Sequence, residues 1–446
     1  MIRDVKAIDS YLRSGCKPRD AWRIGTEHEK FPFHKGTLKP VAYRGKGASI
    51  ENFLHAYLKQ EGGEPIYEDG NIIAIHRPDF GSISLEPGGQ IEFSAHPVAT
   101  LHHACRDIHR HIRAACEVAS TLDIGLLGLG FLPLWQRDDV PWMPKRRYDI
   151  MRQHMVSQGR LGIDMMKRTC TVQVNLDFAS EGMMKECMRI GLALQPLVVA
   201  LFANSPFSEG RLNGFLSYRS HVWTDTDHER CGILPFVYDD DFGFSRYRDY
   251  LLDVPMYFVR RGGTYHDVRG RSFRDFIAGR LAGFEGTYPT LEDVKDHMST
   301  IFTEVRLKTF IEMRGADGGT LERLCALSAF WVGLLYDDSV RQQCLEHIHD
   351  WSMERHRMLR HNIPKDGLRV PLGQGSMAVF AREILALAVR GLKKRGKVNS
   401  HGQDESIFLE PLQEYAQRGV SPADDVIGLW QEHKREMRKV YEHFAY

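Results

Sequence analysis

One stretch of eight residues constrains the fold of this chain more than any other. From Thr171 to Phe178, polar and apolar side chains alternate without interruption. Because successive side chains of a β-strand point to opposite faces of a sheet, this run predicts a strand with one face in the core. Gln173, Asn175 and Asp177 would share the other face.

Three further segments follow the same rule. They place these residues on one face: Glu27 and Glu29 in Ile24–Glu29, Gln90 and Glu92 in Gly89–Phe93 with Glu86 just upstream, and Glu312 with Arg314 in Ile311–Arg314. An antiparallel sheet that is simply wetted on one side would also alternate. Glu and Asn are disfavoured in strands, however, so their recurrence in four segments favours a functional face.

Carboxylates that converge on such a face repel one another. At a separation of ~5 Å, a pair repels by about 3 kcal/mol at an effective dielectric constant near 20. Such a cluster needs cations, and oxygen ligands without clustered His or Cys favour Mg²⁺ or Mn²⁺ over zinc. Mg²⁺ commonly bridges carboxylates to nucleotide phosphates, so the spacing predicts a magnesium site that holds ATP.

Other known sites do not match the sequence. There is no Gly-x-x-x-x-Gly-Lys-Ser/Thr loop, which disfavours a P-loop ATPase. The run Gly125–Gly130 is too apolar for a dinucleotide fingerprint and predicts a buried strand and turn. Four histidines between His102 and His111 spread over several sides of a predicted helix, which disfavours a zinc cluster.

Composition places the chain among globular proteins of balanced charge. Its 446 residues carry 59 Lys plus Arg and 58 Asp plus Glu, a formal charge of 59 − 58 = +1, which gives no support to a nucleic-acid surface. No segment has the ~18 apolar residues of a membrane span, and the first 15 residues match neither a signal nor a transit peptide. We therefore expect a cytoplasmic protein.

The eight cysteines include no C-x-x-C pair, which disfavours a zinc ribbon or a disulfide scaffold.

Over much of the remaining chain, apolar residues recur at the three- and four-residue steps of a helix. It predicts helices over Leu101–Leu122, Leu192–Phe202 and Met377–Leu392, and a further helix that begins at the capping pattern of Ser421 and continues to Phe444. No linker or repeat divides the sequence, so we expect one domain. The predicted class is α+β, with an antiparallel sheet surrounded by helices.

Longer motifs then resemble a known family. Trp22–Phe31 resembles the signature of the plant-type (type 2) glutamate-cysteine ligases of plants and proteobacteria. The resemblance continues through seven more segments: Leu85–Glu92, Pro144–Met151, Arg168–Phe178, Ala203–Phe207, Tyr218–Asp227, Asp253–Phe258 and Glu312–Gly319.

The resemblance implies a function and a fold. The family joins the γ-carboxylate of glutamate to the amine of cysteine at the expense of ATP, through a γ-glutamyl phosphate, in the first step of glutathione synthesis. It implies a glutamine-synthetase-like funnel of antiparallel strands around Mg²⁺ and ATP, formed by a single catalytic domain over residues 1–446.

The resemblance also implies roles for individual residues. The implied ligands of two or three Mg²⁺ ions, or of Mn²⁺, are Glu27, Glu29, Glu86, Glu92, Glu312 and, as a weaker neutral ligand, Gln173. The resemblance implies that Arg147 and Arg219 bind glutamate. The planar guanidinium group of arginine matches the geometry of a carboxylate.

Two of these residues each have two possible roles. Arg314 either contacts phosphate, as a catalytic residue with Glu27 and Glu312, or only neutralises Glu312. Tyr257 either lines the cysteine site or packs in the core.

Redox control is implied in the same way. Cys105 and Cys325 match a regulatory disulfide of plant members, which would close a loop of about 220 residues worth roughly 4 to 5 kcal/mol of chain entropy. A second plant pair is missing, with Val268 and Gly283 near its positions, which disfavours plant-like redox dimerisation. We expect a monomer or weak homodimer, inhibition by glutathione at the glutamate site, and higher activity under oxidant.

Two alternatives remain open from the sequence. A related carboxylate-amine ligase with another amine acceptor would carry the same ATP and metal residues. A Mg²⁺-nucleotide binding protein without turnover would act as a sensor or subunit.

Overall fold

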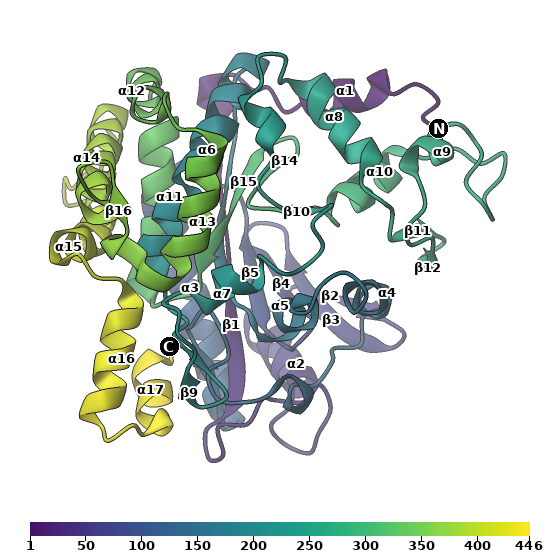
Figure 1. Cartoon of the computed structure of the whole chain (residues 1–446). Helices are drawn as coiled ribbons and strands as arrows, with labels where there is room; N and C mark the ends of the chain where they lie inside the picture. The colour runs from purple at the N-terminus through teal and green to yellow at the C-terminus, as the bar shows by residue number, and fades with distance from the viewer.

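A nine-stranded antiparallel sheet runs through the centre of the protein, whose computed structural model describes residues 1–446 (Figure 1). Eight strands follow the order β14-β15-β7-β1-β5-β4-β3-β2, and β6 pairs with the second half of β1. The strands of this sheet are β1 (Ile24–His34), β2 (Glu64–Glu68), β3 (Asn71–Arg77), β4 (Gly81–Leu85), β5 (Ile91–Ala95), β6 (Ile124–Leu127), β7 (Thr171–Leu176), β14 (Val305–Leu307) and β15 (Ile311–Asp317).

Four small two-stranded sheets lie outside it. They pair β8 (Phe207–Ser208) with β9 (Arg211–Leu212), β10 (Cys231–Gly232) with β13 (Phe302–Thr303), β11 (Phe258–Arg261) with β12 (Thr264–Asp267), and β16 (Pro371–Leu372) with β17 (Gly375–Ser376). The predicted class, an α+β chain with an antiparallel sheet surrounded by helices, is confirmed.

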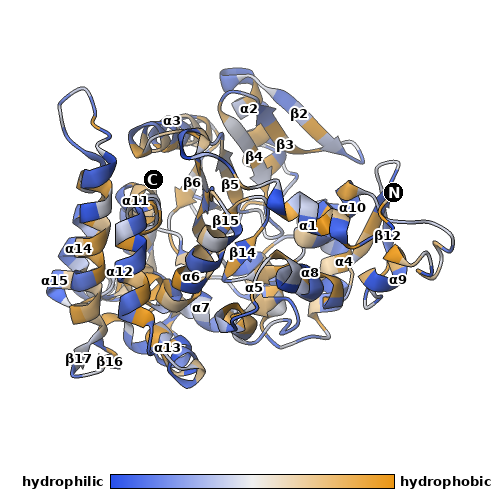
Figure 2. Cartoon of the chain, turned by 90° about the horizontal axis from the view of Figure 1, so that it is seen from above, coloured by the Kyte–Doolittle hydropathy of each residue, from blue (hydrophilic) through white to orange (hydrophobic).

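Helices pack on one face of the central sheet. In this layer α3, α6 and α11 contact the central strands, and α12, α13, α14 and α15 pack outside them (Figure 1). Their bounds are α3 (Leu101–Thr121), α6 (Glu181–Phe202), α11 (Leu321–Leu335), α12 (Asp338–Ile348), α13 (Met353–Asp366), α14 (Met377–Arg395) and α15 (Glu410–Arg418). Figure 2 shows hydrophilic and hydrophobic bands along α12 and α14, as expected for helices with one buried face.

The remaining helices surround the rest of the sheet. They are α1 (Lys6–Arg13), α2 (Ile50–Glu61), α4 (Arg146–Met155), α5 (Gly162–Arg168), α7 (Tyr218–Val222), α8 (Phe244–Asp253), α9 (Phe273–Ile277), α10 (Leu291–Met298), α16 (Pro422–Glu432) and α17 (Met437–Phe444). Short 3₁₀ segments are η1 (Arg19–Ala21), η2 (Arg137–Asp139), η3 (Pro235–Tyr238), η4 (Gly367–Arg369) and η5 (Glu405–Leu409). None of the helices combines the length and the apolar character that crossing a membrane would require.

The core lies between the sheet and the helices. Val172, Val174 and Leu176 of β7 are buried on the helical side, so the alternation predicted from the sequence is confirmed. Three of the predicted helices are also confirmed as parts of α3, α6 and α14.

The predicted last helix is wrong in its length. The Ser421 capping box does begin α16, but that helix ends at Glu432. Lys434 and Arg435 have φ values of 52° and 68°, a left-handed backbone that interrupts the helix before α17 begins. The apolar residues of both parts still pack on Phe31 and Phe33 of β1, which explains why their spacing imitates one continuous helix.

Candidate active site

Strand register brings acidic side chains together on the face of the sheet opposite α3, α6 and α11. In the ladder, Glu29 pairs with Glu92 of β5, and Glu27 pairs with Gln173 of β7. Glu86 follows the end of β4 and faces Glu92 across the turn that joins β4 to β5. Four of the predicted metal ligands therefore lie on one face of the sheet, on neighbouring strands and on the turn after β4.

Burial and mutual repulsion raise the proton affinity of these carboxyl groups. Burial, followed by the charges of Glu86 and Glu92, raises the pKa of Glu29 well above its ordinary value. Burial and Glu86 raise the pKa of Glu92 to about 7, even though Ser94 donates a hydrogen bond to it at 2.8 Å. Burial, Glu92 and Glu312 raise the pKa of Glu27 to about 7. The cluster holds more negative charge than the protein itself balances.

These residues fit a hard divalent cation. Their donors are carboxylate oxygens, the ligands that Mg²⁺ prefers, and burial together with the neighbouring carboxylates raises their pKa values. No three His, Cys, Asp or Glu side chains are placed so that they alone could hold an ion. Mg²⁺ is commonly bound by one or two carboxylates together with waters and substrate phosphates, so the donor set remains compatible with it.

Glu312 is paired with three cations, in contrast to the other glutamates. Arg306 of β14 forms a salt bridge with it, Lys308 Nζ lies 2.9 Å from its Oε1, and Arg314 lies 3.8 Å from its Oε2. Burial alone would raise the pKa of Glu312, but these cations outweigh burial and hold it well below its ordinary value. Its role as a metal ligand stays a prediction, since the carboxylate has protein partners already.

A cavity extends from the acidic cluster toward two arginines. Its lining includes Glu29, Glu86 and Gln173 together with Arg219 and Arg314. Arg314 donates a hydrogen bond to Gln173 Oε1 at 2.7 Å, and Arg219 donates one to the backbone oxygen of Arg314 at 3.1 Å. The side chain of Gln173 is thus engaged by Arg314.

Arg219 is buried and carries free donors. It is 4% exposed, and its Nε and Nη1 groups have no partner in the protein. Asp317 is its nearest compensating charge and accepts hydrogen bonds from Ser205 and Ser217. A buried guanidinium with unused donors in a cavity is suited to bind a carboxylate or phosphate.

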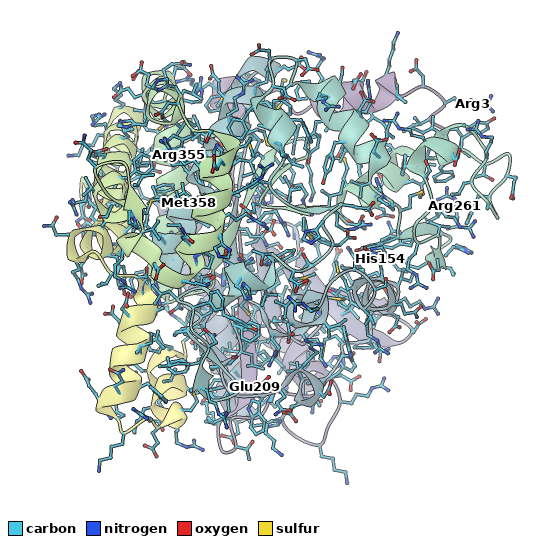
Figure 3. All side chains as sticks on the ribbon, viewed as in Figure 1. Arg3, His154, Glu209, Arg261, Arg355 and Met358 are labelled. Atoms are coloured by element: carbon cyan, nitrogen blue, oxygen red, sulfur yellow. The ribbon has the colours of Figure 1, made fainter.

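The other two predicted substrate residues lie outside this cavity. Arg147, on the first turn of α4, stacks over Phe258 at 5.8 Å and reaches Ser299 at 3.5 Å. Tyr257 is 1% exposed, lies beneath Arg230 at 3.7 Å and contacts His154, which Figure 3 labels near the middle of the molecule. The roles of Arg147 and Tyr257 stay predictions.

The two predicted redox cysteines are brought together by α3 and α11. Their thiols lie within hydrogen-bonding distance, and both are free and buried. The hydrogen bond with Cys105 lowers the pKa of Cys325 to about 7 against burial, and His109 contributes in the same direction. Burial raises the pKa of Cys105, so the two thiols differ in reactivity.

Two polar residues of the predicted strands serve the fold. Asp177 follows β7 and accepts hydrogen bonds from Lys17 and from the backbone of Arg23, which fixes the entry to β1. The Gln90 amide, 1% exposed, bonds the backbone of Gly88, Met166 and Thr169. Asp177 therefore lies outside the cavity, whereas Gln90 lines it and also bonds the neighbouring backbone.

Sequence reasoning missed four residues of the site. Arg306 and Lys308 alternate with apolar residues immediately before the Glu312 segment, a pattern that could have revealed them. Lys145 lies beside Glu86 and donates to the backbone oxygen of Leu85 at 2.7 Å. Gln195 enters from α6, whose sequence reads as ordinary apolar core and gives no signal.

Comparisons with known proteins agree on one family. The family described as "Glutamate-cysteine ligase family 2 (GCS2)" matches residues 23–443. A chloroplastic glutamate-cysteine ligase of Nicotiana tabacum is 50% identical over 98% of this chain and 82% of its own length. One of Brassica juncea is 51% identical over 94% of this chain and 80% of its own length.

A solved structure supports the fold. The glutamate-cysteine ligase of Francisella tularensis, in complex with AMP, matches with a TM-score of 0.57 at 11% identity, over 95% of this chain and 89% of that one.

The predicted cytoplasmic localisation is contradicted by the names of these relatives. The tobacco, mustard, Medicago and Arabidopsis ligases are all named chloroplastic. The prediction rested on the absence of a targeting pattern in the first residues, and such an absence does not determine a compartment.

Proposed function

The chain belongs to the glutamate-cysteine ligase family 2, and we propose that the acidic face of its sheet carries out the reaction of that family. The protein is an ATP-dependent ligase that joins the glutamate γ-carboxylate to the cysteine amine and forms γ-glutamylcysteine, a precursor of glutathione. The observation that carries the assignment to this face is the cluster of Glu27, Glu29, Glu86 and Glu92 beside a cavity that contains Arg219 and Arg314.

The chemistry requires activation of a carboxylate. A carboxylate is a poor electrophile, so the γ-carboxylate oxygen of glutamate first attacks the γ-phosphate of ATP, which gives γ-glutamyl phosphate and ADP. The amine of cysteine then attacks the carbonyl carbon of the γ-glutamyl phosphate, phosphate leaves, and the amine loses a proton. Phosphoryl transfer depends mainly on positioning and on neutralisation of charge, which is what this set of side chains offers.

Magnesium fits the acidic end. Glu27, Glu29, Glu86 and Glu92 would hold Mg²⁺, with Gln173 and Glu312 as further donors, for two or three ions in all. When bound, Mg²⁺ would neutralise the phosphate oxygens of ATP. Without a cation, the raised pKa values of Glu27 and Glu92 favour protonation near neutral pH. Mn²⁺, which accepts the same ligands, is the alternative ion.

The arginines orient the substrates in this proposal. Arg219 binds the α-carboxylate of glutamate through its unused Nε and Nη1 donors. Arg314, between Glu312 and Gln173, contacts the phosphoryl group that is transferred. Arg147 completes the glutamate site, and Tyr257 lines the cysteine site. Both of these roles rest on the family resemblance alone.

Further properties extend the proposal. Residues 1–446 form one catalytic domain, which acts as a monomer or weak homodimer. A disulfide between Cys105 and Cys325 raises activity, and glutathione competes with glutamate. The proximity of the two thiols supports the disulfide.

The decisive experiment is ADP release by the purified protein with Mg²⁺, ATP and glutamate, with and without cysteine, while γ-glutamylcysteine is quantified. Cysteine-dependent ADP with stoichiometric dipeptide is expected. ADP without dipeptide would favour a ligase for another amine, which alanine and 2-aminobutyrate would then test. No ADP would favour a nucleotide sensor.

A pair of variants assigns the reaction to this face. Glu27→Gln should abolish ADP release, whereas Glu64→Gln, on the exposed edge strand β2, should leave it unchanged. Equal activity of the two variants would refute the assignment.

A further inference from the structure

A second, smaller cavity adjoins the one that holds the acidic cluster. The two cavities share Arg219, Trp223, Phe302 and Arg314, so the arginines form the boundary between them. Gln195, Ser220 and Glu304 line the smaller cavity only. A substrate whose reacting group lies at the acidic cluster could therefore extend past Arg219 into this second space.

Gln195 has an unusual environment for a core residue of α6. It is 1% exposed, yet neither its Oε1 nor its Nε2 has a hydrogen-bond partner in the protein. A buried amide without partners destabilises a folded protein, and such groups are rare unless they meet a ligand or water. Its position in the wall of the cavity makes the cavity the source of its partners.

The strand opposite leaves room for this amide. The ladder between β15 and β7 shifts register between Met313 and Ala316, and Gly315 lies within the shift. A Cβ at residue 315 would lie 1.8 Å from Gln195 Nε2, so any side chain there would displace the amide. Because Gly315 has no side chain, there is room for the Gln195 amide beside this strand, at the wall of the cavity.

The groups around the cavity match the head group of an amino acid. Arg219 Nε and Nη1 and Trp223 Nε1 are buried donors without partners, suited to a carboxylate. The α-ammonium group of an amino acid also needs a hydrogen-bond acceptor, whereas the groups just named are all donors. Glu304 is paired with Arg360 through its Oε1 at 2.6 Å, and the Gln195 amide oxygen is a buried acceptor without a partner.

We propose that Gln195 is a specificity-determining residue of the ligase, and that its amide oxygen accepts a hydrogen bond from the α-ammonium of glutamate while Arg219 binds the α-carboxylate. This inference rests on the proposed function of the acidic face. Glutamate has the required shape, because its γ-carboxylate can lie at the acidic cluster while its α-carbon lies beyond Arg219. The amide thereby distinguishes glutamate from dicarboxylates without an amino group.

The test uses Gln195→Met in the full-length enzyme, because methionine has a similar volume and no acceptor. We expect the KM for glutamate to rise about 10- to 100-fold, the range of a hydrogen bond to a charged group, with the KM for ATP unchanged. Leu194→Met, the neighbouring residue of α6, introduces the same side chain into the core and should leave the KM for glutamate unchanged. The melting temperature of Gln195→Met should equal or exceed that of the wild type, since an unpaired amide is removed.

A substrate analogue separates recognition from packing. Glutarate lacks only the amino group, so its inhibition constant against glutamate should change less than about threefold in Gln195→Met. Equal weakening of glutamate and glutarate would overturn the assignment, as would an unchanged KM for glutamate or an effect on cysteine alone. Gln195→Leu provides the same comparison if the methionine variant does not fold. Failure of the wild type to form γ-glutamylcysteine would instead refute the proposed function.

Discussion

Replacing Glu27 by glutamine should stabilise the metal-free protein while it abolishes ligation. In the folded protein the pKa of Glu27 is about 7, against 4.5 in an unfolded chain. The folded state thus binds this proton more tightly than the unfolded chain does. The contribution of Glu27 to the free energy of unfolding is therefore most favourable below pH 4.5 and falls as the pH rises through about 7.

The size of this effect on the free energy of unfolding follows from the pKa shift of Glu27. A difference of 7 − 4.5 = 2.5 pKa units corresponds to an upper limit of about 3 kcal/mol above pH 7. Because Glu27 is only partly buried, solvent reduces this penalty, and we expect Glu27→Gln to gain about 1 to 3 kcal/mol at pH 8. At pH 5 the gain should be below about 1 kcal/mol, since the folded state is then protonated and the penalty for ionising it is largely avoided. The glutamine oxygen can still accept the hydrogen bond from Asn175.

Thermal unfolding followed by circular dichroism in EDTA, at pH 5 and pH 8, measures this gain. For a chain of 446 residues, about 1 kcal/mol shifts the melting temperature by roughly 1 °C, so an increase of up to about 3 °C is expected at pH 8. Adding Mg²⁺ and ATP should stabilise the wild type and not the variant. An equal gain at both pH values, or no gain at pH 8, would refute the argument that burial and the neighbouring carboxylates raise the pKa of Glu27.

Three further predictions follow from neighbouring features. Glu312→Gln should destabilise the protein by about 3 to 5 kcal/mol in chemical unfolding, because it leaves the charges of Arg306 and Lys308 without their buried partner; a change below about 1 kcal/mol would contradict the pairing. Gly315→Ala should raise the KM for glutamate in the ADP assay, because the new Cβ displaces the Gln195 amide; an unchanged KM would show that the amide has no role there. Cys105→Ser should remove the increase in activity that oxidant produces in the wild type, whereas Cys344→Ser, a buried thiol outside the pair, should retain it; equal rates with and without reductant in the wild type would exclude redox control.

Strand periodicity made a large part of the site predictable. A period of two identifies which side chains share a face, so the amino-acid sequence alone is enough to group Glu27 with Glu29, and Glu92 with Gln90. The same rule also grouped Asp177 with Gln173 and Asn175, because periodicity does not tell whether a polar group turns back to bond the backbone.

Contacts between distant segments could not be predicted. Gln195 lies 120 positions before Gly315, and only the packing of α6 on β15 brings them together. In the same way, the two left-handed residues after α16 break a helix that apolar spacing alone predicts to continue, since both of its parts cover the same strand.

The position of β1 in the sheet also determines when the protein can fold during its synthesis. This strand is made first but lies in the middle, between β5 and β7, and β15 follows so late that Glu312 comes 285 residues after Glu27. A nascent chain therefore carries an open edge at β7 until about two thirds of the sequence has left the ribosome. Such late, long-range pairing slows folding and exposes strand edges to aggregation, so this enzyme should depend on chaperones during translation more than its length alone implies.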